Sequence, residues 1–346
     1  MPKNIRVLIV DDSPFFRNYL QTGLSKYSGL EVIDTAANTN EAREKILRLN
    51  PDVVTMDVEM PGMNGIDFLR SFLPTHPVHV VIITSSAAGA FDAISAGAVE
   101  FMRKPDANEK DQFIARLAST VRFAQLARIK TASPAAASAA APRTEARADP
   151  IIVPGIPRKN MMIALGASTG GTDALVEIVR RFPANTPPVV ITQHMPPTFT
   201  KMFAERVNRI CAMSAKEAED GDRLITGRII IAAGGLQMRV MRDNNGYFIT
   251  SRPGPKVSGH CPSVDVLFDS VADAAGPNAV AAILTGMGED GAKGLLKLHN
   301  TGAFTVGQDE ETCVVYGMPA VAFKKGAVSV QLPLQEIAKQ LLLKVR

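Results

Sequence analysis

The segment from residue 131 to residue 157 differs in composition from the rest of the chain and limits how the chain can fold. It is rich in alanine and proline and has almost no large apolar residue before Ile151. Alanine favours helix, but Pro134, Pro142 and Pro150 interrupt any long helix here, so we expect a flexible or semi-extended linker. The linker predicts two domains, at residues 1–125 and 158–346, with residues 126–157 between them. A chain of 346 residues is long enough for both domains to bury their own cores.

Composition narrows the class of protein. A hydrophobic content of 46% with 21% charged residues excludes a mainly disordered chain, and no apolar stretch approaches the ~18 residues that span a membrane. The formal net charge of +4 comes without a dense basic run, so we expect no nucleic-acid partner. The N-terminus lacks a secretory signal, and the 3 cysteines are far apart, which indicates reduced thiols. We therefore expect a cytoplasmic protein without direct membrane insertion, in which Cys211, Cys261 and Cys313 serve packing.

Both halves of the chain alternate strand-like apolar runs with helix-period segments. In the first half the expected strands cover residues 5–10, 31–36, 52–56, 80–83 and 100–102. In the second half they cover residues 162–165, 189–192, 228–232 and 280–284, with Asp243-Asn244-Asn245-Gly246 as a hairpin signal. This alternation predicts two doubly wound parallel α/β domains: a flavodoxin-like one, then a larger one with an antiparallel hairpin.

Charged residues follow the expected strands of the first domain. Asp11 and Asp12 come directly after the first strand, Asp57 after the third, and Lys104 after the fifth. Because the carboxyl ends of parallel strands meet at one edge of a sheet, these side chains should converge. A single aspartate there more often caps a helix, but three carboxylates together favour a divalent cation such as Mg²⁺. Such an ion can also bind a phosphoryl group.

A possible nucleophile opens the second domain. Its first strand runs into Gly166-Ala167-Ser168-Thr169-Gly170-Gly171, a turn that exposes a serine hydroxyl at a helix N-terminus. A phosphate or dinucleotide loop is the alternative, although Ser168 stands where that fingerprint needs glycine. His194 follows the next strand, 26 residues later, and could act as its base. Asp290 or Glu289, after a later strand, could orient the imidazole.

The first domain resembles the receiver domain of response regulators, on the residues Asp11-Asp12, Asp57, Pro61-Gly62 and Lys104-Pro105. The resemblance implies that Asp57 accepts phosphate from a sensor histidine kinase of the chemotaxis type. It also implies that Asp11, Asp12 and Asp57 form the Mg²⁺ site and that Lys104 pairs with the phosphoryl group. A hydroxyl at the end of the fourth strand should report phosphorylation; we favour Ser85, with Thr84 close behind.

The second domain resembles the catalytic domain of the chemotaxis protein-glutamate methylesterases. The matching motifs are GASTGG, TQHMPP, LTGMGEDG, PSVDVLF and CVVYGMP. The resemblance implies a Ser168 nucleophile, a His194 base, an Asp290 acid and an active-site loop containing Met287, with no cofactor for hydrolysis. It further implies demethylation and deamidation of methyl-accepting chemoreceptors, with the unphosphorylated receiver restricting access to Ser168.

Two other functions remain possible from the residues. A response regulator with a DNA-binding output would need a small basic helical module, whereas this output has about 190 residues. A catalytically silent adaptor would bind receptors without hydrolysis, and replacing Ser168 would distinguish it. The residues also leave open whether His260 contacts substrate or supports the fold.

Overall fold

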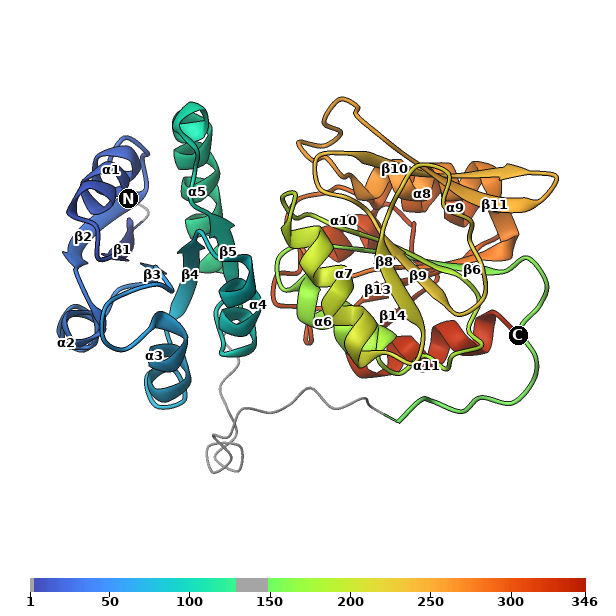
Figure 1. Cartoon of the computed structure of the whole chain (residues 1–346), viewed down its shortest axis with the longest axis horizontal. Helices are drawn as coiled ribbons and strands as arrows, with labels where there is room; N and C mark the ends of the chain where they lie inside the picture. The colour runs from blue at the N-terminus through green and yellow to red at the C-terminus, as the bar shows by residue number, and fades with distance from the viewer. Residues whose placement is uncertain (1–2, 129–148) are drawn as a thin grey trace. The chain divides into compact units, whose positions relative to one another are not determined.

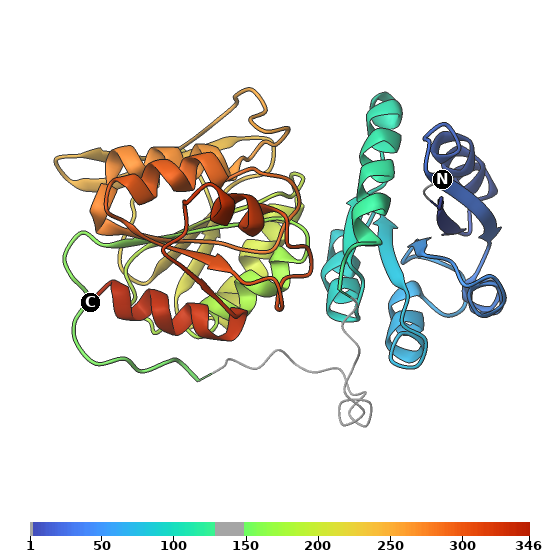
Figure 2. The same cartoon turned by 180° about the vertical axis from the view of Figure 1, so that it is seen from behind.

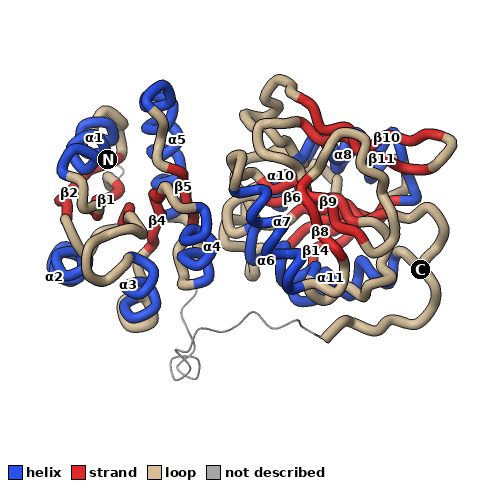
Figure 3. Tube along the Cα trace, viewed as in Figure 1, coloured by secondary structure: helices blue, strands red, loops and turns tan. Residues whose placement is uncertain are grey.

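The computed structural model describes residues 3–128 and 149–346, which form two compact units divided within the intervening stretch. Most of the expected linker therefore lies outside the described residues. Figures 1 and 3 show that each unit is a parallel sheet covered by helices. No helix in the described parts of the chain combines the length and apolar character needed to cross a membrane. Because the two units are not placed relative to each other, each is described by itself.

The first unit is a sheet of five parallel strands in the order β2-β1-β3-β4-β5. The strands are β1 (Ile5–Val10), β2 (Leu30–Ala36), β3 (Val53–Met56), β4 (His79–Thr84) and β5 (Glu100–Arg103). The helices are α1 (Pro14–Leu24), α2 (Thr39–Leu49), α3 (Gly65–Phe72), α4 (Ala87–Ser95) and α5 (Lys110–Ala124), with a short 3₁₀ turn at Ala107–Glu109. Helices α1 and α5 cover one face of this sheet, and α2, α3 and α4 cover the other (Figure 2).

Local sequence signals explain where two of these helices begin and end. The Ser13 hydroxyl accepts a hydrogen bond from the Phe16 N–H at 3.3 Å, and Pro14 occupies the first helical position of α1. Helix α2 ends at Leu49 and is capped by Asn50, which has a left-handed backbone with φ 47° and directly precedes Pro51. The start of α1 fixes the end of the loop after β1, which carries Asp11 and Asp12.

The second unit has a seven-stranded parallel sheet in the order β14-β13-β12-β6-β7-β9-β8. Its strands are β6 (Met162–Ala167), β7 (Val189–Gln193), β8 (Ser214–Glu217), β9 (Arg228–Ile231), β12 (Ala279–Ile283), β13 (Phe304–Gln308) and β14 (Val330–Leu332). A separate antiparallel pair, β10 (Gln237–Asp243) and β11 (Gly246–Arg252), forms the expected hairpin. The predicted fold class of two doubly wound α/β domains, one with an antiparallel hairpin, is confirmed.

Helices cover both faces of the larger sheet (Figure 1). They are α6 (Gly171–Val179), α7 (Phe199–Ile210), α8 (Val264–Ala274), α9 (Ala292–Asn300), α10 (Met318–Lys324) and α11 (Leu334–Lys344), with a 3₁₀ turn at Gly276–Asn278. Helices α8, α9 and α10 share one face with the hairpin, and α6, α7 and α11 share the other. Every residue of β6, β7 and β12 is buried, as expected for the central strands of a parallel sheet. The carboxyl ends of these three strands support the candidate site.

Candidate active site and receiver pocket

Ser168 lies on a tight turn between β6 and α6. Its N–H donates to the Thr285 carbonyl at 3.0 Å, so the turn is tied to the residues that follow β12. Gly170 has φ 74°, and a Cβ built there would lie 2.6 Å from the Val314 side chain. Only glycine satisfies both conditions without strain. The turn therefore holds Ser168 half-buried at the carboxyl edge of the sheet.

His194 directly follows β7, the strand that pairs with β6. Gln193 and Ala167 are partners in this ladder, and the His194 N–H donates to the Ala167 carbonyl at 3.3 Å. Ser168 and His194 thus each follow one member of a strand pair. Neighbouring strands are about 4.8 Å apart, so the two residues lie side by side, as the sequence predicts.

Asp290 follows β12, which pairs with β6 on the side opposite β7. Its side chain is 1% exposed, and its Oδ2 lies 2.7 Å from His194 Nε2. The same carboxylate accepts hydrogen bonds from the Ser263 hydroxyl at 2.7 Å and from the Val264 and Asp265 N–H groups at 2.7 and 3.1 Å. These donors belong to the N-terminal turn of α8. The acid is therefore fixed by a helix N-terminus as well as by the imidazole.

The hydrogen bonds decide the charge of this buried carboxylate. Burial alone would raise the pKa of Asp290, but hydrogen bonds from His194, Ser263 and Val264 and the attraction of His194 lower it below its ordinary value. Asp290 therefore stays ionised and accepts a hydrogen bond from the N–H at His194 Nε2. This tautomer leaves Nδ1 as the basic nitrogen, and His194 Nδ1 is buried with no hydrogen-bond partner among the described residues.

His260 lies flat against His194. The two ring centroids are 3.6 Å apart and the planes differ by 3°. Burial, assisted by the charge of His194, lowers the pKa of His260 from 6.5 to about 4. His260 is therefore neutral at pH 7. The geometry thus places His260, whose role the residues leave open, against the imidazole of His194.

The loop after β12 packs on Ser168. A Cβ built on Gly286 would lie 2.7 Å from Ser168 Cβ, so only glycine permits this close approach. Met287 follows on the same loop and is half-buried. Glu289, the alternative acid, is exposed and has its carboxylate 3.9 Å from Lys325 Nζ instead of near His194. Of the two candidates, Asp290 is the one that reaches the imidazole.

The receiver residues also converge. Lys104 Nζ lies 2.6 Å from Asp57 Oδ2 and 2.8 Å from Asp11 Oδ2. Asp11, Asp12 and Asp57 each bring a carboxylate oxygen within 4.8 Å of the others. Such a set of hard oxygen ligands, two of them buried, fits Mg²⁺.

Burial dominates the electrostatics of this cluster. It raises the pKa of Asp11 more than the nearby ammonium of Lys104 lowers it. It would also lower the pKa of Lys104, but the hydrogen bonds and charges of Asp11 and Asp57 raise that pKa above its ordinary value. Lys104 is therefore a permanent cation between two carboxylates. A divalent cation at the same oxygens would favour the ionised form of Asp11.

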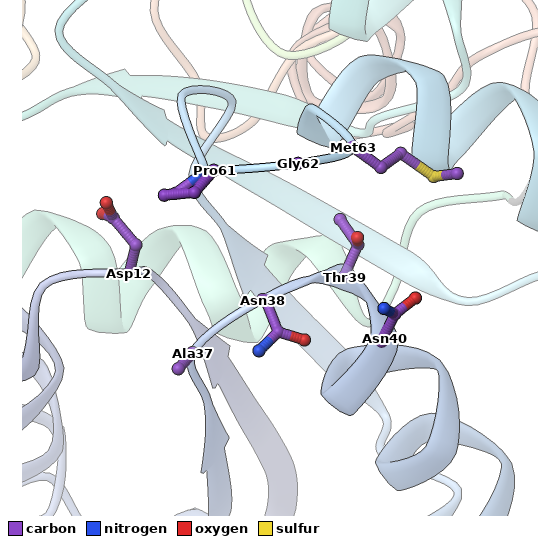
Figure 4. Close-up of a pocket in the computed structure, with 8 residues that line it drawn as sticks. All are labelled: Asp12, Ala37, Asn38, Thr39, Asn40, Pro61, Gly62 and Met63. Carbon is purple, nitrogen blue, oxygen red and sulfur yellow. The ribbon is translucent and has the colours of Figure 1, made fainter.

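A pocket of about 480 Å³ opens beside Asp12, the exposed member of the cluster (Figure 4). The loop after β2, the first residues of α2 and the residues 61–63 form its other walls. The two candidate reporter hydroxyls differ in exposure. Thr84 is fully buried at the end of β4, and its Oγ1 accepts from the Ser86 N–H at 3.0 Å, whereas Ser85 is exposed. The Thr84 carbonyl also accepts from the Lys104 N–H at 3.0 Å.

Sequence reasoning missed two contributors to the candidate active site, Ser263 and Gln193, and left the role of a third, His260, open. Ser263 precedes α8 and could have been identified as a helix cap, but its bond to Asp290 has no sequence signal. The stacking of His260 on His194 depends on a loop that returns from the hairpin. Gln193, next to His194, donates from Nε2 to the Ser168 carbonyl at 2.9 Å.

Comparison with known proteins settles the family. Residues 163–341 match the family described as CheB methylesterase, and residues 7–117 match the response regulator receiver domain. The chain belongs to the CheB methylesterase family. The predicted architecture of a receiver followed by a methylesterase domain, and the predicted hydrolase class, are confirmed.

Relatives match over almost the whole chain. The chain is 46% identical over 342 residues to "Protein-glutamate methylesterase/protein-glutamine glutaminase 2" of Syntrophomonas wolfei, covering 98% of this chain and 97% of the relative. It is 47% identical over 341 residues to the protein-glutamate methylesterase/protein-glutamine glutaminase of Agrobacterium fabrum, covering 97% and 95%. The crystal structure of the Thermotoga maritima CheB methylesterase catalytic domain superimposes with a TM-score of 0.52 and 36% identity, covering 54% of this chain and 99% of that one.

Proposed function

We propose that the second domain removes methyl groups from glutamate γ-methyl esters of methyl-accepting chemoreceptors through Ser168, His194 and Asp290. The observation that carries this proposal is the 2.7 Å hydrogen bond between His194 and Asp290. These two residues follow the strands on either side of β6, the strand that leads to Ser168. The same site would convert receptor glutamines to glutamates, as the names of the relatives imply. Demethylation of receptors gives sensory adaptation in chemotaxis.

The first half of the reaction forms an acyl-enzyme. The Ser168 Oγ attacks the ester carbonyl while His194 Nδ1 takes the hydroxyl proton. Asp290 stabilises the resulting imidazolium through Nε2–H. The tetrahedral intermediate collapses, and the proton from His194 leaves with the methoxide as methanol.

The second half releases the product. Water attacks the acyl-enzyme, again losing its proton to His194, and the glutamate carboxylate and free Ser168 are restored. For a glutamine substrate the leaving group is ammonia in place of methanol. The ester chemistry uses no metal in this scheme. The neutral state of His260 supports it, because a second positive charge against His194 would oppose formation of the imidazolium.

The receiver domain provides control. We assign residues 1–125 to it, 126–157 to a linker and 158–346 to the catalytic domain, because the family matches fall within these bounds. Asp57 accepts a phosphoryl group from a chemotaxis-type histidine kinase in the cytoplasm. Mg²⁺, held by Asp11, Asp12 and Asp57, would neutralise the charge on the transferred group, and Lys104 would pair with a phosphoryl oxygen.

The phosphorylation signal needs a hydroxyl near Asp57. Thr84 is better placed for this role than Ser85, since it is buried and its backbone is bonded to that of Lys104. Replacing Thr84 with alanine should leave phosphorylation of Asp57 intact but uncouple it from esterase activity. The same change at Ser85 should have little effect.

The release of methanol from methylated receptor membranes tests the catalytic assignment. Ser168→Ala should abolish release, and Ser214→Ala, an exposed serine of the same domain, should not. Circular dichroism of each variant checks the fold. Methanol release by Ser168→Ala at the rate of the unmodified chain would exclude the serine mechanism. Receptor binding by a chain that releases no methanol in any state would indicate an adaptor.

A further inference from the structure

Two donors fix the carbonyl oxygen of Ser168. The Gly171 N–H donates to it at 2.7 Å, and Gln193 Nε2 donates at 2.9 Å. A carbonyl oxygen has two lone pairs, so this one has its full set of hydrogen bonds. The Gly171 bond belongs to the turn itself, whereas the Gln193 bond comes from a different strand, β7.

The carboxamide of Gln193 has one possible orientation. Gln193 is 3% exposed, and its Oε1 is buried without a hydrogen-bond partner among the described residues. A flipped amide would place an oxygen against the Ser168 carbonyl oxygen, which is repulsive. A Cβ built on Gly171 would lie 2.2 Å from Gln193 Oε1, so the carboxamide fills the space of a side chain there. An unpaired buried acceptor costs free energy, and this cost needs a functional explanation.

The peptide bond between Ser168 and Thr169 indicates what the buried carboxamide of Gln193 does. The Ser168 C=O and the Thr169 N–H belong to one planar trans peptide, so they point in opposite directions. Fixing the carbonyl toward Gln193 therefore directs the Thr169 N–H away from it. The Thr169 N–H donates to no acceptor among the described residues. In serine hydrolases with this strand–turn–helix arrangement, the N–H of the residue after the nucleophile stabilises the oxyanion.

We propose that Gln193 is a positioning residue, which orients the Ser168–Thr169 peptide so that the Thr169 N–H donates to the oxyanion formed on Ser168. This inference rests on the proposed role of Ser168 as nucleophile. Gln193 itself contacts neither the ester nor the proton that moves. Gln193 keeps the Thr169 N–H in place before negative charge develops on the oxyanion. No free energy is then needed to reorient this donor during the reaction.

Two variants of the full-length chain test the role of Gln193. Gln193→Leu removes the donor at similar volume, and Gln193→Glu keeps the shape but replaces Nε2 with oxygen. The control is Thr192→Val on the same strand, because the Thr192 hydroxyl is buried and makes no hydrogen bond within the described residues. Methanol release from methylated receptor membranes gives kcat and KM. The affinity for an alkylboronic acid, whose serine adduct is tetrahedral, reports oxyanion stabilisation.

Removing a whole oxyanion donor lowers kcat by about 10²–10³-fold, so a misdirected donor should lower it by about 10- to 100-fold. We expect this loss in both Gln193 variants, with an unchanged KM and an equal loss of boronic acid affinity. Thr192→Val should behave as the unmodified chain. A residue that only packs would lower thermal stability without changing kcat. Normal kcat and boronic acid affinity in a folded Gln193 variant would overturn the proposal.

The unmodified chain provides an independent test, which holds even where a variant fails to fold. Hydrogen exchange of the Thr169 amide should be fast in the free protein and slow in the boronic acid adduct. Unchanged exchange would overturn the proposal. If Ser168→Ala still releases methanol, the proposed nucleophile is wrong. If only Ser168→Ala is inactive and the Gln193 variants are normal, the positioning role alone is wrong.

Discussion

Replacing His260 with phenylalanine should change how the stability of the methylesterase domain depends on pH. The variant keeps an aromatic ring against His194 but removes the ionisable group. Burial lowers the pKa of His260 from 6.5 to about 4, so the unfolded chain binds a proton in this range that the folded domain does not. Stability therefore falls as the pH falls from about 6.5 to about 4. Below about pH 4 both states bind the proton, so this destabilisation reaches its limit and grows no further.

The shift sets the size of the effect. Each pKa unit corresponds to about 1.4 kcal/mol, so His260 should destabilise the folded domain by about 2 kcal/mol at pH 5 and about 3 kcal/mol at pH 4, relative to pH 7. The shifts of carboxylates that do not interact with His260 occur in both proteins and cancel in the difference. The loss of the His260 titration, together with its interactions with His194 and Asp290, should separate the two curves.

Urea unfolding of the two proteins between pH 4 and pH 7, followed by a probe in the methylesterase domain, measures this difference. An NMR titration of the histidine ring protons, with His260 assigned by its loss in the variant, gives the pKa directly. Parallel stability curves for the two proteins would refute the reasoning. A His260 titration near 6.5 would do the same, because it would mean that the stacked ring is well solvated.

Three further changes test the remaining sites. Asp290→Asn should lower methanol release by on the order of 10⁴-fold, since the amide cannot stabilise the imidazolium, while thermal unfolding shows whether the N-terminus of α8 stays intact. Asp57→Asn should prevent labelling by a small phosphodonor, and EDTA should block labelling of the unmodified chain; acid-stable label on serine would contradict the receiver assignment. The fragment 150–346 should hydrolyse methyl esters faster than the unphosphorylated full-length chain, and phosphodonors should not change its rate. Equal rates would mean that activation comes from contacts that the phosphorylated receiver adds.

The central parts of both sheets were predictable from the sequence because they are uniformly apolar and end in charged or small residues. Strand β1 was predicted with its observed bounds, and β6 and β7 with errors of one or two residues at their ends. Strand β14, by contrast, has three residues that are only half-buried at the sheet edge, so it has no clear apolar run. Strand β8 begins with the exposed Ser214 and also lacks a clear apolar run.

In the candidate site, too, some features were predictable from the sequence and others were not. Topology placed Ser168 and His194 at one sheet edge, but it left Asp290 and Glu289 as alternatives, and only the family resemblance selected Asp290. The structure adds that β12, β6 and β7 are neighbours. The side-chain contacts from loops and flanking strands were not predictable in this way. The stacking of His260 and the hydrogen bond of Gln193 depend on rotamers and on a loop that crosses between elements, and neither has a local sequence pattern.

The strand order also determines when a refolding chain can become active. His194 and Asp290 are 96 residues apart in the sequence, and they meet only after β12 has paired with β6. The hairpin and α8 are made from the chain between them. Recovery of ester hydrolysis therefore reports that β12, β6 and β7 have all paired. The circular dichroism signal of the helices can return earlier, because helices depend on local contacts. By the same logic, two fragments divided between β7 and β12 would each lack part of the triad, and hydrolysis would measure their reassociation.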